Sequence, residues 1–124
     1  MNCGDIPLPP LQFDHAPTIR TFVSYVPYGQ VGMVCRAHGV RGPALFVDRG
    51  NNAAALLSQV SDGGFEMKAC SWKDVANLGF VVLPEKTSGS ISAEWETCAL
   101  RHEYGHINGW AANHPDAHFE DDSL

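Results

Sequence analysis

Apolar and polar residues alternate over several short segments in the first half of the chain, and this pattern predicts strands. Residues 19–26 are rich in β-branched and aromatic side chains and predict one strand. Residues 27–30, Pro-Tyr-Gly-Gln, have turn chemistry, and residues 31–37 then resume a strand pattern. Together these segments predict a β-hairpin.

Short apolar segments between Gly, Pro and Asn residues predict further elements. Residues 44–48 and 65–72 are two candidate strands. Residues 79–84 form a continuous apolar run that ends at a proline, as expected for a buried strand. Residues 53–60 are rich in alanine and leucine and predict a short helix, whereas residues 73–78 predict one helical turn or a loop.

The clearest element is a helix near the end of the chain. Ser92 can cap its first turn, where Glu94 and Glu96 interact favourably with the helix dipole. The helix is expected to run to about Asn108, because Gly109 allows the chain to leave the helical path.

The beginning of the chain has a different composition. Four prolines fall within the first 18 residues and predict an extended arm that wraps the domain. With 124 residues, 44% of them hydrophobic, the chain predicts a single domain over residues 1–124 with one core. The expected fold class is α+β, in which a small, twisted, mainly antiparallel sheet packs against the C-terminal helix.

The charge balance narrows the range of partners. Fourteen acidic residues against eight Lys and Arg give a formal net charge of -6, which repels nucleic-acid phosphates and anionic lipids. No apolar run approaches the roughly 20 residues of a membrane span. We therefore expect neither nucleic acid nor a membrane as a partner. The sequence does not define an oligomeric state. The N-terminus lacks the order of a signal peptide, so a cytoplasmic protein and an exported protein whose signal has been removed both stay open.

Four cysteines, Cys3, Cys35, Cys70 and Cys98, lie far apart and form no C-x-x-C pair. Two disulfides and four buried thiols both fit this spacing, and export would favour the disulfides. Cys98 lies one helical turn before His102, but it is expected to be a buried thiol or a half-cystine rather than a metal ligand.

The predicted helix contains the sequence His102-Glu103-Tyr104-Gly105-His106, the H-E-x-x-H pattern of zinc hydrolases. Residues four apart share one helix face, so both imidazoles can bind one ion while Glu103 leans toward the open side of that ion. Zinc lowers the pKa of a bound water toward about 7, and a neighbouring carboxylate can take up the proton. The spacing predicts one Zn²⁺ held by His102 and His106, with Glu103 as the catalytic residue.

A third metal ligand is expected from the chain after the helix. Because Gly109 ends the helix, the chain can turn back and bring His114 to the ion, which leaves one position open for catalysis. Pro115 is expected to keep His114 in an extended backbone conformation. Asp116 is the alternative ligand or a supporting acceptor. The weaker alternatives are His118 and Glu120, and the final acidic residues predict a solvated tail.

The other histidines and tryptophans have simpler interpretations. His15 and His38 lie in loop-like segments and are expected at the surface. Trp95 and Trp110 flank the motif and are expected to pack the helix onto the sheet.

The motif resembles that of the zincin metallopeptidases. Residues 102–109 are similar to the H-E-x-x-H-x-x-G core of the metzincin branch, but Ala112 stands where that branch has its third ligand, and no methionine follows Met67. Residues 98–115 more closely resemble small bacterial and phage zincin-like proteins with H-E-x-x-H-x-N-G-W followed by a histidine. The matching residues are His102, Glu103, His106, Asn108, Gly109, Trp110 and His114.

This resemblance implies a minimal zincin-like fold and zinc-dependent hydrolysis of peptide bonds in a peptide or protein substrate. Glu103 would activate a zinc-bound water as general base and then act as general acid. Two alternatives stay open. One is a non-catalytic zinc-binding module with a structural role in a phage or secretion apparatus, and the other is an amidase that acts on cell-wall peptides.

Overall fold

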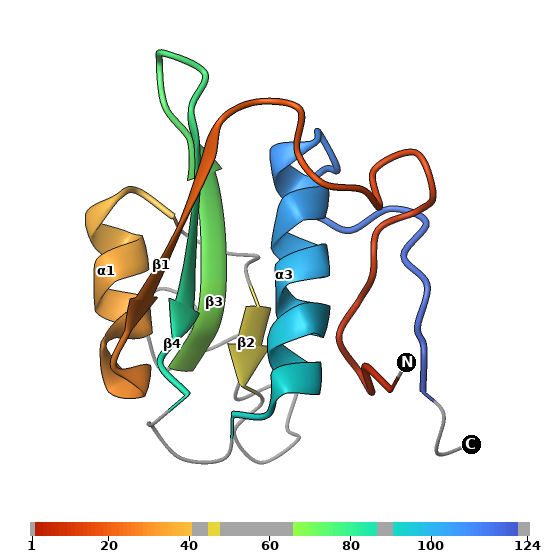
Figure 1. The fold of residues 1–124 in the computed structure, drawn as a ribbon, viewed down its shortest axis with the longest axis horizontal. Coiled ribbons are helices and arrows are strands. Elements are labelled where there is room, and N and C mark those ends of the chain that lie inside the picture. The colour runs from red at the N-terminus through yellow and green to blue at the C-terminus, as the bar shows by residue number, and fades with distance from the viewer. Residues whose placement is uncertain (1, 41–44, 48–65, 87–90, 122–124) are drawn as a thin grey trace.

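A computed structural model describes residues 2–40, 45–47, 66–86 and 91–121 of the chain (Figure 1). In chain order, these residues form the strands and helices β1 (Thr21–Val26), the 3₁₀ helix η1 (Tyr28–Gln30), α1 (Val31–Ala37), β2 (Leu45–Val47), β3 (Glu66–Lys73), β4 (Gly79–Pro84) and α3 (Ala93–Ile107). The helix expected at residues 53–60 lies outside the described residues.

The four strands form one mixed sheet in the order β1-β4-β3-β2. The pairs β4 with β3 and β3 with β2 are antiparallel, whereas β1 runs parallel to β4, with Thr21 opposite Gly79 and Val26 opposite Pro84. The expected α+β class with a mainly antiparallel sheet is confirmed for the described residues, and the parallel pairing of β1 was not expected.

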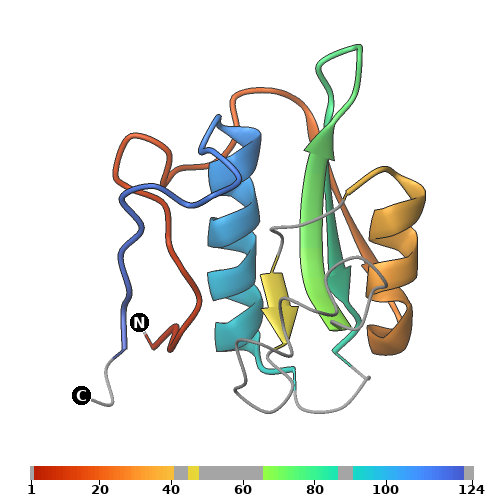
Figure 2. The ribbon, with the colours of Figure 1, turned by 180° about the vertical axis from the view of Figure 1, so that it is seen from behind.

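The sheet lies between two helices, and the chain ends add a further layer. Figures 1 and 2 show α1 on one face of the sheet, α3 on the other, and the N- and C-terminal segments on the far side of α3. The N-terminal segment, for which the sequence predicted an extended arm, contains turns and lies against the motif helix.

In the part of the chain that the structure describes, two hydrophobic clusters lie on the two sides of the sheet, where the sequence predicted one core. The cluster on the α3 side of the sheet joins residues of the sheet and of α3 with three residues of the N-terminal arm, and it contains Cys3, Ile6, Leu8, Ala69, Val81, Leu83, Cys98, Ala99 and Ile107. The cluster between α1 and the sheet contains Val31, Cys35, Met67, Cys70 and Val82. Of the two cysteine states left open by the sequence, the structure has the disulfides, one in each cluster: Cys3–Cys98 and Cys35–Cys70.

The hairpin expected at residues 19–37 is wrong, because Val31–Ala37 is the helix α1. Val31 and Cys35 are the buried residues of this segment, and their i, i+4 spacing places both on one face of a helix. That face packs against β3, where Cys35 forms its disulfide with Cys70. Tertiary contacts outweigh the β-branched composition that favoured a strand.

The motif helix has the ends that the sequence predicts. Ser92 precedes α3, and its Oγ accepts a hydrogen bond of 3.0 Å from the N–H of Trp95. At the other end Asn108 is the C-cap and Gly109 has a φ of 111°, a left-handed conformation that glycine adopts without strain. α3 packs against β3 and β4, and this packing fixes the position of the helix and of the histidines on it.

The short connection between β3 and β4 is a loop. The Oδ1 atom of Asp74 accepts hydrogen bonds of 2.9 Å from the N–H groups of Ala76 and Leu78. Asn77 adopts a φ of 61°, a conformation that asparagine tolerates better than most residues. Of the two forms predicted for residues 73–78, the loop is present at residues 74–78, and Lys73 is the last residue of β3.

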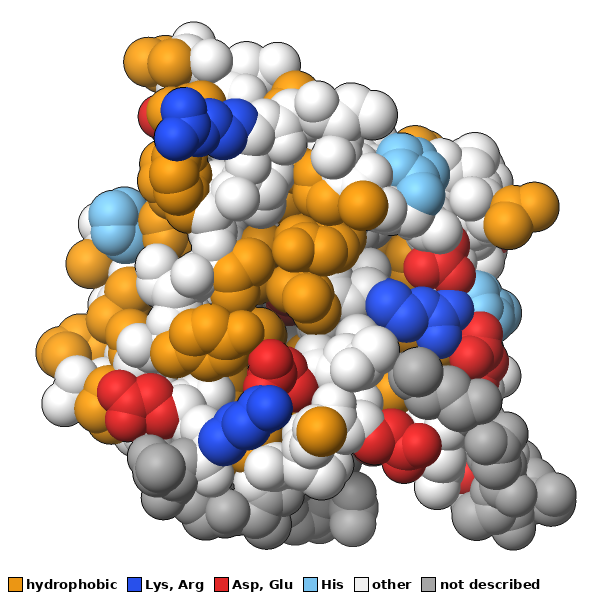
Figure 3. Space-filling view, in the orientation of Figure 1, with side chains coloured by type: hydrophobic (Ala, Val, Ile, Leu, Met, Phe, Trp, Pro, Cys, Tyr) orange, Lys and Arg blue, Asp and Glu red, His pale blue; other side chains and the backbone are white. Residues whose placement is uncertain are grey.

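Among the described residues, no helix is both long enough and apolar enough to cross a membrane. Figure 3 shows that hydrophobic side chains gather over β1 and along its boundary with α3. Phe22 and Tyr25 of β1 are 40% and 47% exposed.

Candidate metal centre

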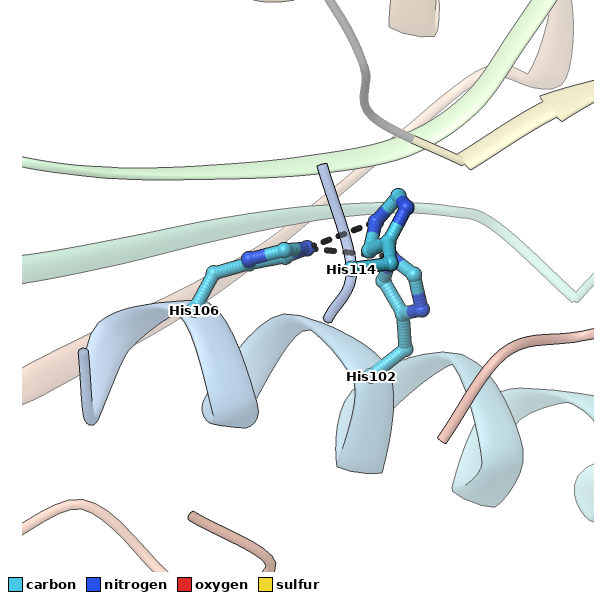
Figure 4. Close-up of side chains that lie close together, drawn as sticks. All are labelled: His102, His106 and His114. Carbon is cyan, nitrogen blue, oxygen red and sulfur yellow. Dashed lines mark hydrogen bonds between the residues drawn. The ribbon is translucent and has the colours of Figure 1, made fainter. Parts of the chain in front are cut away.

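Three histidines meet beside α3. His102 and His106 lie one turn apart on the helix, and His114 approaches them from the segment that follows it (Figure 4). The Nε2 atoms of His102 and His106 are 3.3 Å apart, and those of His106 and His114 are 3.1 Å apart. The ligand atoms of all three residues lie within 4.8 Å of one another. The structure thus brings together the three histidines that the sequence predicted as ligands.

Main-chain carbonyl groups fix the rings of the two helical histidines. The Nδ1 atom of His102 donates a hydrogen bond of 2.6 Å to the carbonyl oxygen of Pro7, and that of His106 donates one of 2.9 Å to Trp110. A carbonyl oxygen can only accept, so the proton of each neutral ring resides on Nδ1. Both Nε2 atoms therefore carry a free lone pair that faces the other rings.

His114 reaches the cluster through a tight turn rather than through an extended segment. Its backbone N–H donates a hydrogen bond of 3.0 Å to the carbonyl of Ala111, and its φ is 59°. The expected extended conformation is therefore wrong. The indole Nε1 of Trp110 donates to the carbonyl of Pro115 at 2.8 Å, which holds the turn in this form. A left-handed backbone at a residue other than glycine is strained and is often found at functional sites.

Trp110, for which the sequence predicted packing of the helix onto the sheet, packs beside the histidines. It is only 2% exposed, and its ring stacks on that of His106 with the centroids 4.8 Å apart and an interplanar angle of 15°. Its ring also contacts His102 and His114 edge-on or tilted. Trp95, in contrast, packs against the cluster on the α3 side of the sheet, as predicted.

The asparagine of the H-E-x-x-H-x-N-G-W segment holds the N-terminal arm. The Nδ2 group of Asn108 donates hydrogen bonds of 2.9 Å to the carbonyl of Phe13 and of 2.8 Å to the carbonyl of His15. The glycine after it ends the helix, as described above, and the tryptophan supports the rings. The asparagine, the glycine and the tryptophan of this segment therefore each fix the chain around the end of the motif helix.

Glu103 is buried on the sheet side of the helix. It is 1% exposed, and its Oε1 accepts a hydrogen bond of 2.8 Å from the hydroxyl of Ser71 on β3. Its other oxygen, Oε2, is buried without a hydrogen-bond partner among the described residues. Burial raises the pKa of Glu103 to about 7, and the hydrogen bond from Ser71 opposes this shift.

Burial also keeps the three imidazoles uncharged. It lowers the pKa of His102 to about 3 and that of His114 to about 4, and it lowers the pKa of His106 as well. A neutral imidazole is the form that binds a metal ion. The cluster is therefore ready to bind a cation at neutral pH without first releasing protons.

Three histidines this close together could hold a metal ion, and two of their separations can be compared with those of a zinc site. Two nitrogens that bind one tetrahedral zinc at about 2.0–2.1 Å lie about 3.4 Å from each other, close to the two separations given above. The lone pairs of His102 and His106 cannot share a hydrogen bond, because both protons reside on Nδ1, and a cation between them removes their repulsion. The unpartnered oxygen of Glu103 is the kind of acceptor that such a site uses.

The other candidate ligands lie outside the cluster. Cys98 is in a disulfide, and Asp116 is exposed. His118 pairs with Glu120 at 2.9 Å, and Glu120 in turn pairs with Arg101 at 3.0 Å. Glu120 is therefore a bound residue and not part of a solvated tail, which corrects the expectation for the chain end. His15 and His38 are exposed, as predicted.

Comparison with protein-family models gave no match for this chain, and searches among curated proteins and solved structures gave none either. The histidine cluster and its surroundings are therefore interpreted from their own geometry.

Sequence reasoning missed three partners of the site. Pro7 and the main-chain oxygen of Trp110 act through carbonyl groups, which every residue has, so no side-chain pattern marks them. Ser71 left a weak signal, because it is a hydroxyl residue in a strand that faces the motif helix with Ala69. A polar residue on a buried strand face indicates a partner on the opposite element.

Proposed function

We propose that this chain is a zinc-dependent metallopeptidase of minimal zincin type. His102, His106 and His114 would hold one Zn²⁺, and Glu103 would be the catalytic residue. Two observations carry the proposal: the ligand atoms of the three histidines lie within 4.8 Å of one another, and Glu103 is buried with one carboxylate oxygen that has no hydrogen-bond partner among the described residues. The resemblance of residues 98–115 to zincin-like proteins agrees with it.

Zinc, when bound, acidifies a coordinated water and polarises the carbonyl group of a peptide. The chain's own contribution is proton transfer by Glu103. Ser71 holds Oε1 of this carboxylate, so Oε2 is the atom left to accept a proton from water. The same oxygen can then deliver the proton to the leaving amine. Burial keeps the carboxyl group away from bulk solvent and so protects this proton from exchange during the reaction.

One contact favours a second candidate, a non-catalytic metal-binding module. The hydrogen bond between Ser71 and Glu103 joins β3 to α3, so this glutamate also links the sheet to the helix. In such a module, metal and glutamate would both serve folding alone. A cell-wall peptide amidase would use the same residues as a peptidase and would differ in substrate.

The test combines metal content with hydrolysis. The zinc-loaded wild type would be incubated with a mixture of denatured proteins and, separately, with cell-wall peptides, and the products analysed by mass spectrometry. We expect cleavage by the wild type and a loss of at least about a hundredfold in the Glu103→Gln variant, because only the proton acceptor is removed. Zinc content should stay the same in both proteins.

Glu94→Gln is the matched control, since this glutamate is exposed in the first turn of the same helix. It should cleave at the wild-type rate. Equal turnover by the wild type and Glu103→Gln would refute the mechanism. A wild type that binds zinc but cleaves neither substrate class would favour the non-catalytic module.

A further inference from the structure

The N-terminal arm and the motif helix are joined at two positions one turn apart. Cys3 of the arm forms a disulfide with Cys98 of α3, and Pro7 accepts the hydrogen bond from Nδ1 of His102. Cys98 and His102 are four residues apart on the helix, and Cys3 and Pro7 are four residues apart on the arm. The covalent link therefore lies directly next to the contact that orients a candidate ligand.

The arm stays in close contact with the helix beyond this point. A Cβ atom added at Gly105 would lie 2.7 Å from Cβ of Pro9, so only a glycine lets the arm approach so closely. Between the two prolines, Leu8 is fully buried and exchanges main-chain hydrogen bonds of 2.9 and 3.0 Å with His118. The arm is thus held on the helix by a disulfide at one end and by packing at the other.

The contact of Pro7 matters because it decides which nitrogen of His102 can bind a metal. With an acceptor at Nδ1, the ring keeps its proton there and presents Nε2 to the cluster. If the carbonyl group moves away, no acceptor holds the proton at Nδ1, and the ring can change tautomer. Loss of such a supporting acceptor typically costs about 10- to 100-fold in metal affinity.

We propose that the disulfide Cys3–Cys98 is a positioning device of the metal site, which holds the Pro7 carbonyl against His102 and so orients Nε2 toward the metal. This inference rests on the proposed metal site but not on its catalytic activity. The second disulfide, Cys35–Cys70, lies in the cluster on the other face of the sheet and should have no such effect.

The two disulfides provide a matched pair of variants. Zinc affinity would be measured by competition with a chelator dye for wild type, Cys3→Ser/Cys98→Ser and Cys35→Ser/Cys70→Ser, at a temperature at which circular dichroism shows each to be folded. Both double variants lose a cross-link and hence stability. We expect the first to bind zinc at least about tenfold more weakly than the second. Equal affinities of the two variants would overturn the proposal.

A second measurement on the zinc-free protein separates positioning from general destabilisation. Nitrogen-15 NMR of the histidine rings reports which ring nitrogen carries the proton. We expect His102 to be protonated at Nδ1 in the wild type and in Cys35→Ser/Cys70→Ser, and to be a mixture of tautomers in Cys3→Ser/Cys98→Ser. Protonation of His102 at Nε2 in the wild type would overturn the proposal. This outcome needs only the wild type, so the test also works if the Cys3→Ser/Cys98→Ser variant does not fold. A wild type that binds no zinc would refute the proposed function, while the tautomer measurement would still test the role of the arm.

Discussion

The chemistry of single residues in this protein depends on which nitrogen of each histidine carries the proton. Two carbonyl oxygens orient the rings of His102 and His106. One belongs to Pro7, which precedes the helix in the sequence, and the other belongs to Trp110, which follows it. Because hydrogen bonds at Nδ1 leave Nε2 as the only lone pair, each ring presents Nε2 to the cluster. His114 adds the third nitrogen from a strained backbone, which a turn held by Trp110 maintains.

His114 and Asp116 can now be distinguished by a substitution at each. His114→Ala removes one of three ligand atoms, and we expect zinc affinity to fall by several orders of magnitude, since two histidines alone bind zinc weakly. Asp116→Ala should change zinc affinity less than about threefold. Asp116 is exposed and lies outside the cluster, so it does not support any of the three rings. Competition with a chelator dye measures both, and the reverse ranking would assign the ligand role to Asp116.

Elements with a local signal could be predicted from the sequence, and elements that depend on distant contacts could not. The helix from Ser92 to Gly109 has its cap, its acidic first turn and its stop in one short stretch, and the structure confirms it. Val31–Ala37 carries residues that suit either a strand or a helix, and only its packing and its disulfide to β3 decide for the helix.

The candidate site also combines residues that a local motif predicts with residues that only the fold brings together. His102, Glu103 and His106 stand in one helical motif, so their positions follow from helix geometry. His114 comes back to them through a turn whose conformation differs from the predicted one. The acceptor from Pro7 lies 95 residues before its histidine in the sequence, and only the fold brings the two together.

Contact between the arm and α3 predicts an unusual response to a glycine substitution. Gly105→Ala should destabilise the protein, although alanine normally stabilises a helix interior by about 1 kcal/mol relative to glycine. The added Cβ would lie 2.7 and 2.8 Å from the rigid ring of Pro9 and 3.0 Å from Trp110. We expect a lower Tm in thermal unfolding, because overpacking typically costs about 1–3 kcal/mol.

Gly32→Ala is the control for this experiment. At this position of α1 the nearest atom to an added Cβ is the end of the flexible Arg36 side chain, at 3.1 Å, which can move away. Its Tm should be unchanged or slightly higher. A higher Tm for Gly105→Ala would show that the arm does not pack tightly on the helix.

On the scale of the whole molecule, both chain ends are attached to the motif helix by one arginine. Arg101 binds Asp14 of the N-terminal arm with contacts of 2.6 and 3.2 Å, and it binds Glu120 near the C-terminus with two contacts of 3.0 Å. Such paired, bidentate ion pairs are stronger than single surface contacts. The arginine therefore stabilises the layer that carries Pro7 and His114.

This attachment predicts a dependence of stability on pH. The hydrogen bonds from Arg101, and then from His118, lower the pKa of Glu120 to about 2 from an ordinary value of 4.5. Below about pH 5 the unfolded chain takes up a proton at this residue before the folded chain does, so its stabilising effect is present above pH 4.5 and lost as the pH falls toward 2. Urea unfolding of the wild type and Glu120→Gln should differ more at pH 6 than at pH 3.5. A difference that does not change with pH would contradict this assignment.

The claim that His102, His106 and His114 hold one zinc ion is tested most directly by anomalous X-ray scattering at the zinc edge, from a crystal grown with one equivalent of zinc. We expect a single strong peak about 2.0–2.1 Å from each of the three Nε2 atoms, with the Nδ1 atoms of His102 and His106 still on their carbonyl partners. The absence of a peak among the three rings, or a peak on other residues only, would contradict the claim.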